Sequence, residues 1–364
     1  MDNKIIDIIL NNDVDAILVS NKYDITYVSN FTGEDALVLL TKNNFYIITD
    51  KRYMEQAKVQ CTKIKVEVAD DNLDSKGIIK NLLDLNNVYK LGIDICDIKY
   101  DFYLQLKELF FNVEIKNLKE PFKESRTIKS QDEILKIKTA CKIADRTFYR
   151  LLDIVTEGMS EKDIEIEMNY IIKREGGDGY SFVPVIGIEE KTSMPYSLPD
   201  KSILARKGSF ILLNFGVNYE GYTSALARMI ALGTVRSEYK KMYTCLYDVY
   251  MKILSLVKPY TEYEKLYGCF ENEIKNTEYK KFFLTSIGHG RGLQTIEGYA
   301  IKPNIKRNML PNEVYSIGIS ISVPGYGGAR LEDVVLIKDN SIEILTDSVR
   351  KLINIWKIIM SKVG

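Results

Sequence analysis

The stretch Leu212–Gly233, LLNFGVNYEGYTSALARMIALG, has the pattern of two β-strands joined by a short turn. Apolar residues dominate both ends, and the polar glycine-containing segment NYEGY (218–222) supplies the turn. Asn214 is a polar residue within the first strand, and Ala225 is a small residue at the start of the second. The question is whether this hairpin belongs to an active site or only to a frame around one.

The chain around this hairpin predicts an α+β domain. Strands are expected at 313–323 and 329–337, and amphipathic helices at 236–257 and 261–277. Upstream, Ser130 with Glu133 forms a capping box that opens a helix reaching residue 154. Ser160 with Asp163 opens a second helix, which Gly176 and Gly177 end.

The N-terminal third predicts a separate, smaller α/β domain. Short apolar strands are expected at 15–20, at 35–50 as a pair turning at 42–44, and at 91–95, with a helix at 51–60. A chain of 364 residues is too long for one ordinary core. We therefore expect two domains, at 1–124 and 125–364.

Composition excludes several classes of function. Lysine plus arginine and aspartate plus glutamate number 50 each, so no bulk charge favours nucleic acid or an anionic membrane. No apolar run approaches the roughly 18 residues that span a bilayer. The first twenty residues lack a basic segment and a cleavage site, so a signal peptide is not expected. The prediction is a cytoplasmic protein without membrane or nucleic-acid partners.

Cysteine and histidine counts restrict the chemistry further. The five cysteines are widely spaced and form no C-x-x-C pair, which predicts free thiols rather than zinc sites or disulfides. His289 is the one histidine of the chain. This excludes a multi-histidine metal cage and any Ser-His or Cys-His scheme that is not built on His289.

Six segments together resemble the creatinase, prolidase and aminopeptidase P family. They are YVSNFTGEDALVLLT (27–41), FYIITDKRYMEQA (45–57), RTIKSQDEILKIKTACKIAD (126–145), the hairpin at 212–233, SIGHGRGLQTIEG (286–298) and GGARLEDVVLI (327–337). They follow the family's order over nearly the whole chain. The resemblance implies a creatinase-like N-terminal α/β domain, a C-terminal domain with the pita-bread fold and a homodimer.

The resemblance also implies five metal-ligand positions. Active peptidases of the family hold two divalent ions with two aspartates, one histidine and two glutamates. The matching positions here are Asn214, Ala225, His289, Gly318 and Glu332. Since three of the five ligands are missing, we expect a degenerate site with no metal cofactor.

The family's substrate-handling histidines are replaced as well. Thr285 stands four residues before His289, Ile296-Glu297 replaces an H-E pair, and Pro195-Tyr196 replaces a P-H pair. Tyr196, Glu297 and Asn214 are therefore candidate pocket residues.

Arginines offer a substitute for the missing metal charge. Arg291 lies two residues from His289, so on a strand both side chains project from the same face. An arginine suits a carboxylate because it can form two parallel hydrogen bonds. We hypothesise that Arg291, with Arg228 or Arg330, neutralises Glu332 in place of metal.

Three functions follow from these substitutions. The favoured one is a pseudoenzyme that binds a peptide, a small molecule or a protein partner in the pocket. The second is a metal-independent, creatinase-like C–N hydrolase in which His289 and Glu332 are catalytic. The third is a residual Xaa-Pro dipeptidase or aminopeptidase that holds one ion through Asn214, His289 and Glu332.

Overall fold

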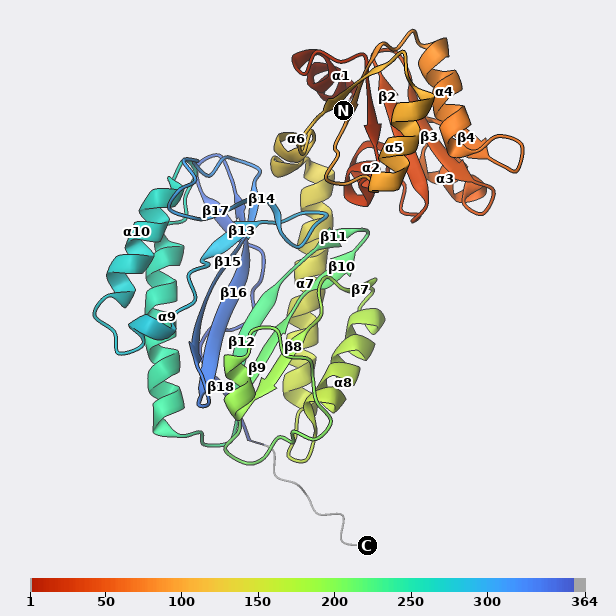
Figure 1. Ribbon diagram of the computed structural model, residues 1–364. Coiled ribbons are helices and arrows are strands. Elements are labelled where there is room, and N and C mark those ends of the chain that lie inside the picture. Colours follow the sequence, from red (N-terminus) through yellow and green to blue (C-terminus); the bar gives the residue numbers. More distant parts are fainter. Residues whose placement is uncertain (1, 357–364) are drawn as a thin grey trace, which may run out of the picture. The chain divides into compact units, whose positions relative to one another are not determined.

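The computed structural model describes residues 2–356 and divides into two compact units, one up to Arg126 and one from Thr127 onward. Figure 1 shows both units as mixtures of helices and sheet strands. Among the helices of the described range, none combines the length and apolar character needed to cross a bilayer. The five cysteines are free thiols, with Cys61 and Cys141 buried and Cys96 exposed.

The first unit is built on a sheet that has six strands in the described range, in the order β4-β3-β2-β1-β5-β6. β2 runs antiparallel to both of its neighbours, and the other pairs are parallel. The strands predicted at 15–20, 35–50 and 91–95 are confirmed as β1, the β2–β3 pair and β5. The elements are α1 (Asp2–Asn11), β1 (Ala16–Val19), α2 (Lys22–Ser29), β2 (Ala36–Thr41), β3 (Phe45–Asp50), α3 (Met54–Gln60), β4 (Lys65–Ala69), α4 (Ser75–Leu85), β5 (Lys90–Ile93), α5 (Tyr100–Leu109), β6 (Glu114–Asn117) and, at the end of the unit, α6 (Lys123–Thr127).

The second unit begins with two capped helices, α7 (Gln131–Ile154) and α8 (Glu161–Arg174). Ser130 with Glu133 and Ser160 with Asp163 both form complete capping boxes, as the sequence predicts. The elements that follow are β7 (Gly179–Tyr180), β8 (Val185–Ile188), the 3₁₀ helix η1 (Glu189–Ser193), β9 (Phe210–Phe215), β10 (Val217–Tyr219), β11 (Tyr222–Thr223), β12 (Leu226–Leu232), α9 (Ser237–Leu256), α10 (Tyr263–Ile274), η2 (Lys280–Phe282), β13 (Gly288–Gly290), β14 (Glu297–Ala300), β15 (Val314–Val323), β16 (Gly327–Ile337), β17 (Ile342–Ile344) and β18 (Ile353–Ile355).

The main sheet of this unit is curved, with α7 and α8 on one side and α9 and α10 on the other (Figure 1). Its strand order is β14-β13-β15-β16-β12-β9-β8, with β17 beside β16 and β18 beside β12. Ile211, Leu213 and Phe215 of β9 pack against α7 and α8, and Ile317 and Ile319 of β15 pack against α9 and α10. We call these helix-covered sides of the strands the outer face.

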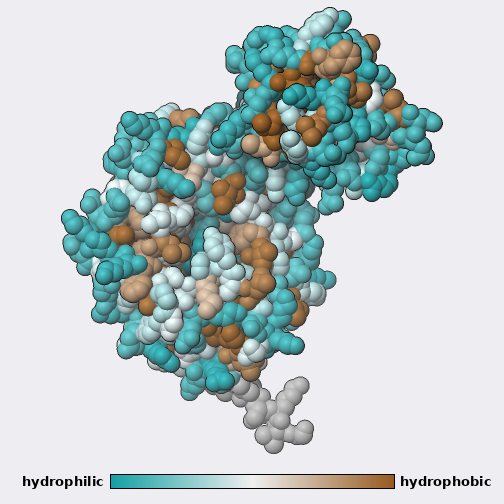
Figure 2. Space-filling view, viewed as in Figure 1, coloured by the Kyte–Doolittle hydropathy of each residue, from teal (hydrophilic) through white to brown (hydrophobic). Residues whose placement is uncertain are grey.

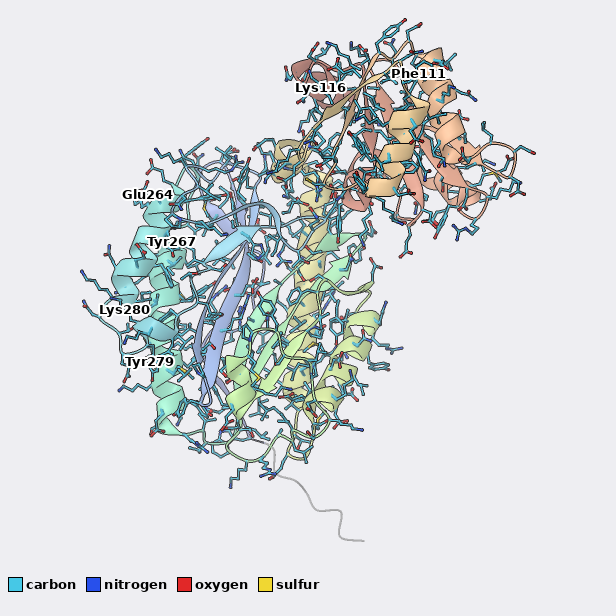
Figure 3. The ribbon with its side chains drawn as sticks, viewed as in Figure 1. Phe111, Lys116, Glu264, Tyr267, Tyr279 and Lys280 are labelled. Carbon is cyan, nitrogen blue, oxygen red and sulfur yellow. The ribbon has the colours of Figure 1, made fainter. Side chains whose placement is uncertain are left out.

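The opposite side of the strands is the inner face. Successive residues of a strand face opposite sides of the sheet. Asn214 therefore lies on the inner face because Leu213 lies on the outer face, and Gly318 lies on the inner face because Ile317 lies on the outer face. Side chains fill much of the space between the two halves of the curved sheet (Figure 3). The labelled Glu264 and Tyr267 lie on α10, and Tyr279 and Lys280 lie at η2, so these four belong to the helical layer (Figure 3).

The predicted hairpin at 212–233 is correct in its two long strands and wrong at its tip. β9 and β12 pair antiparallel from Phe215 with Leu226 to Phe210 with Ala231. The tip leaves this sheet and forms β10 and β11, which join β7 in a second sheet with three described strands. Gly216 stands at the departure point, where a Cβ atom would lie 2.0 Å from the carbonyl oxygen of Ser224. The pairing of β9 with β12 ends at this point, where the two strands approach each other so closely that a residue without a side chain is needed.

Candidate functional site

A single row of residues crosses the inner face of the main sheet. Gly318 lies directly opposite Glu332, Glu332 opposite Ala227, and Ala227 opposite Asn214. Directly opposed residues project from the same face of a sheet. The row therefore brings Asn214 of β9 and Glu332 of β16 to one surface, although they are far apart in the sequence.

The remaining predicted positions adjoin this row. His289 lies opposite Ser316, which is two residues from Gly318 and so shares its face. Ala225 precedes β12 by one residue and is completely buried. The structure thus places all five positions for which the resemblance implies metal ligands around the same part of the inner face.

Two arginines hold the Glu332 carboxylate. Arg330 donates to Oε2 of Glu332 from Nη2 at 2.6 Å and from Nε at 3.2 Å. Nη2 of Arg291 lies 3.7 Å from Oε1 of the same carboxylate. Burial by itself would raise the pKa of Glu332, but Arg330, Arg291 and His289 outweigh it and lower the pKa to about 2. Glu332 is therefore an ionised carboxylate that is already neutralised by protein groups.

Arg291 is fixed from several sides and is almost completely buried. Its Nε donates to the Ser316 hydroxyl at 2.7 Å, and its Nη1 donates to the Ser224 carbonyl at 3.0 Å and to the Thr223 hydroxyl at 3.3 Å. A buried guanidinium needs such partners because its desolvation is costly. The resemblance did not indicate Ser316 or Thr223. The alternation of β15 could have indicated Ser316, because it shares a face with Gly318.

Gly318 makes room for the present position of Glu332. A Cβ atom at Gly318 would lie 2.9 Å from Cβ and 3.0 Å from Cγ of Glu332. A glutamate at position 318 therefore requires the Glu332 side chain or the strand pair to shift. The missing ligand at 318 and the placement of Glu332 between two arginines are thus sterically linked.

His289 and Glu332 both lie in the described part of the chain, and no hydrogen bond joins their side chains there. Its Nδ1 lies 3.0 Å from the carbonyl oxygen of Gly290, the residue next in the chain. Burial and the nearby Arg291 lower the pKa of His289 to about 4, against the opposing effect of Glu332. The imidazole is consequently neutral at pH 7.

Arg228 does not contribute to the inner face, which corrects one alternative of the sequence hypothesis. Its Nη2 donates to Oδ1 of Asp333 at 2.5 Å. Its hydrogen bond to Glu332 runs from Nη1 to the backbone carbonyl at 2.8 Å and does not involve the carboxylate. Arg228 and Asp333 each follow an inner-face residue, Ala227 and Glu332, so alternation turns both to the outer face. Arg330 and Arg291 are the arginines that meet the Glu332 carboxylate.

Two other predicted pocket residues are placed away from the row. Glu297 is 5% exposed, and its Oε1 accepts a hydrogen bond from Lys129 at 2.9 Å. The charge of the Glu297 carboxylate is thereby neutralised by Lys129 within the fold. Tyr196 is 91% exposed and projects into solvent beside the exposed apolar residues Met194 and Leu198. The face seen in Figure 2 carries such apolar residues in small groups within a mainly hydrophilic surface.

A small pocket opens beside Asn214. It is lined by Thr192, Ser193, Pro195, Leu212, Asn214, Leu284, Ser320, Ile321, Ser322, Ala329 and Arg330. The pocket has room, about 10 Å³, for the centre of one water-sized group. The Asn214 side chain is almost fully buried, and its Oδ1 has no hydrogen-bond partner in the described part of the chain. Such a group is uncommon in native proteins and calls for an explanation.

The side chains present do not fit a two-metal centre. Two divalent ions need several carboxylates, and the five positions supply one carboxylate, one imidazole and one amide. That carboxylate is paired with Arg330, and the cation Arg291 lies 3.7 Å from it. Among residues 2–356, no group of three or more histidine, cysteine, aspartate and glutamate side chains is arranged to hold a metal ion.

Comparison with known proteins identifies relatives over almost the whole chain. A Xaa-Pro dipeptidase of Pyrococcus horikoshii is 27% identical over 352 residues, covering 96% of this chain and 97% of that protein. An uncharacterised peptidase of Bacillus subtilis, YqhT, is 26% identical over 93% of this chain and 96% of its own length. The solved structure of a Xaa-Pro dipeptidase from Bacillus anthracis superposes with a TM-score of 0.91 at 26% identity, covering 97% of this chain and 98% of that one.

Two family models divide the chain between them. Residues 3–128 match the creatinase/prolidase N-terminal domain, and residues 135–339 match metallopeptidase family M24. The predicted fold, a creatinase-like α/β domain followed by a pita-bread domain, is confirmed by these matches and by the likeness to the solved structures. The chain belongs to metallopeptidase family M24, in the group of creatinase, prolidase and aminopeptidase P.

Proposed function

We propose that this chain is a pseudoenzyme of its family, which binds a ligand at the inner face of the pita-bread domain without hydrolysing it. The observation that carries the proposal is the state of Glu332. Its carboxylate, which the resemblance makes a metal ligand, bonds to Arg330 at 2.6 Å and faces Arg291 at 3.7 Å. A metal ion that used Glu332 would have to displace Arg330 and approach the charge of Arg291.

The charge balance supports this proposal. Arg291 and Arg330 contribute two positive charges against one negative charge from Glu332, so the group has a formal charge of +1. Adding divalent ions to a region that is already positive is unfavourable when few carboxylates remain to offset them. Without metal there is no bound hydroxide of lowered pKa to attack an amide.

The metal-independent hydrolase is less well supported. A general base works best when its pKa is near the working pH, and the pKa of His289 is lowered to about 4. Nδ1 of His289 lies beside the Gly290 carbonyl, and no carboxylate in the described residues orients the ring. Glu332 is engaged with arginine and makes a poor proton acceptor at its low pKa.

The residual peptidase is the alternative that the relatives favour, since two of the similar proteins are named Xaa-Pro dipeptidases. It requires Asn214, His289 and Glu332 to hold one ion together. The positive charges of Arg330, which bonds to Glu332, and of Arg291, 3.7 Å from it, argue against a metal ion there.

An activity assay separates the three functions. Ala-Pro and creatine are incubated with the purified protein, with and without added Mn²⁺, beside a His289→Ala variant. We expect no turnover in any sample and less than one bound metal equivalent per chain by elemental analysis. Turnover that needs Mn²⁺ would establish the peptidase, and metal-free turnover lost in His289→Ala would establish the hydrolase.

A reconstitution experiment tests the role of Arg291 directly. The variant Asn214→Asp/Ala225→Asp/Gly318→Glu/Arg291→Leu restores the family's five ligands and removes the buried cation. It should bind Mn²⁺ measurably, whereas the matched triple variant that keeps Arg291 should bind it far more weakly. Equal metal binding by both variants would show that Arg291 does not take the place of metal.

Two further expectations stay predictions. The homodimer follows from the family resemblance, and sedimentation of the full chain would test it. The cytoplasmic location is an expectation as well, and cell fractionation would test it.

A further inference from the structure

The last strand of the sheet in the first unit leaves one edge unpaired. β6 (Glu114–Asn117) pairs with β5 and with no other strand of the described residues. Glu114 and Leu118 donate their backbone N–H groups to carbonyls on the β5 side. Since the backbone groups of successive strand residues point to alternate sides, those of Ile115 and Asn117 point outward. Such an edge is a template for pairing with another chain.

The side chains of this edge carry opposite charges two residues apart. Glu114 and Lys116 face the same side of the sheet, because they are alternate residues of one strand. Glu114 is exposed and forms no ion pair in the described residues. Lys116 lies 3.3 Å from the carboxylate of Asp13, and its side chain is 36% exposed. The edge thus presents an acid without a partner beside a base that solvent still reaches.

A second copy of the same strand complements this pattern. When two β6 strands pair antiparallel about Ile115, Glu114 of each copy lies opposite Lys116 of the other. The outward N–H and C=O groups of Ile115 then exchange hydrogen bonds with the same groups of the second copy. Glu114 and Lys116 fall at the neighbouring pairs without hydrogen bonds, where opposed side chains are closest. Both copies use the same surface, so the contact closes as a twofold pair.

Apolar side chains flank the edge on the other side of the sheet. Ile115 packs against the core cluster that α4 and α5 cover. Phe111, in the turn before β6, is 79% exposed and is labelled with Lys116 in Figure 3. Tyr89, whose carbonyl accepts the N–H of Glu114, is 67% exposed. A second Ile115 beside the first would extend this core, and burial of apolar surface favours association.

The opposite edge of the sheet is a useful comparison. β4 carries Lys65 and Glu67, so its charges have the same spacing. Nζ of Lys65, however, donates to Oδ1 of Asn44 at 2.8 Å and lies 5.3 Å from the ring centroid of Tyr46. This base is turned toward its own sheet. The observations therefore favour β6 over β4 as the pairing edge.

We propose that β6 is a self-association surface, at which two copies of this chain join their first-unit sheets by antiparallel pairing about Ile115. The family resemblance implies a homodimer and names no surface, so the proposal goes beyond it. It is also independent of the proposed function, because no residue of the pita-bread domain takes part.

Charge reversal tests the register of this pairing. Sedimentation equilibrium of the full-length chain over a concentration series measures the dissociation constant of each association step. Glu114→Lys places lysine opposite lysine, and Lys116→Glu places glutamate opposite glutamate. Each variant alone should therefore weaken one step by about tenfold or more. An equimolar mixture of the two variants should recover that step, since every lysine then meets a glutamate.

Two further variants separate edge pairing from folding and from net charge. Ile115→Pro removes an outward N–H that the pairing with β5 does not use, so it should abolish the same step. Circular dichroism should show an unchanged fold in this variant. Glu67→Lys is the matched control, because it makes the same charge change on β4, and it should leave every step unchanged.

Four outcomes would overturn the proposal. They are a native chain that does not self-associate, native-like association of Glu114→Lys and Lys116→Glu, a mixture that does not recover, and an equal loss in Glu67→Lys. None of them bears on the proposed function, which is tested by metal content and turnover.

Discussion

On each face of the pita-bread sheet a buried carboxylate lies beside two arginines. The two clusters differ in how many hydrogen bonds the surrounding groups make. On the outer face, Asp333 lies between Arg228 at 2.5 Å and Arg350 at 2.7 Å, and it also accepts hydrogen bonds from Tyr250 and Thr346. On the inner face, Glu332 lies between Arg330 at 2.6 Å and Arg291 at 3.7 Å. Adjacent residues of one strand thus supply both acids.

The difference lies in the groups around each acid. Arg228 donates to carbonyls of Ala227, Glu332 and Ser348 besides Asp333, so the outer cluster leaves little capacity for a ligand. In the inner cluster, Nε and Nη2 of Arg330 are used for Glu332, and Oδ1 of the neighbouring Asn214 has no partner in the described residues. A completed network stabilises a fold, whereas an incomplete one is available for binding.

The largest effect is expected from breaking the outer cluster. Asp333→Asn leaves Arg228 buried without its counter-charge, and loss of one member of a buried pair costs about 3–5 kcal/mol. Urea denaturation followed by circular dichroism measures the change. A loss below about 1 kcal/mol would contradict a structural role for the outer cluster.

A smaller effect is expected from Arg291→Met on the inner face. The substitution removes hydrogen bonds to Ser316 and Ser224, but Arg330 still neutralises Glu332. We expect a loss of about 2–3 kcal/mol in the free energy of unfolding. If Arg291→Met destabilises the protein more than Asp333→Asn, the inner cluster is the structural one.

The pH dependence should be smaller again. His289 has a pKa of about 4 in the folded chain against 6.5 unperturbed, because its burial and the nearby Arg291 and Arg330 outweigh the opposing effects of Glu332 and the Gly290 carbonyl. The unfolded chain therefore binds the proton more readily between these values. Stability is then fully present above pH 6.5 and falls as the pH drops toward 4, with a slope of at most about 1.4 kcal/mol per pH unit.

A His289→Gln variant isolates this contribution, since the chain has no other histidine. The difference in unfolding free energy between the native protein and the variant is measured from pH 4 to pH 7. A difference that grows as the pH falls in the native protein's favour would show that the histidine is not held neutral.

The smallest effect on stability is expected from Arg330→Ala. The side chain is 28% exposed, and partly exposed ion pairs contribute about 1 kcal/mol or less. Urea denaturation of the variant beside the native protein measures the change. A loss as large as that expected for Arg291→Met would place Arg330 with the structural arginines.

Much of the fold was predictable from the sequence, because capping boxes and apolar periodicity are local signals. Both the Ser130–Glu133 and Ser160–Asp163 boxes start the helices they predict. The tip of the 212–233 hairpin was not predictable in the same way. It depends on the contact of Gly216 with Ser224 and on pairing with β7, which no local pattern records.

The candidate site was predictable in part, and strand alternation explains where the prediction failed. Alternation correctly gives Arg291 and His289 one face, and applied to Arg228 it would have excluded that residue. Glu297 pairs with Lys129, which is 168 residues away in the sequence, and no local pattern in either segment indicates this pair. The free carboxamide of Asn214 likewise appears only when its surroundings are known.

Gly318 couples two positions of the sheet that are 14 residues apart in the sequence. Any side chain at position 318 would place a Cβ atom 2.9 Å from Cβ of Glu332 while Arg330 holds that carboxylate. A larger residue at 318 is therefore accepted only if Glu332 or the strand pair moves, and a movement of Glu332 changes its contact with Arg330. Substitutions at positions 318, 330 and 332 should consequently be non-additive in their effects on stability.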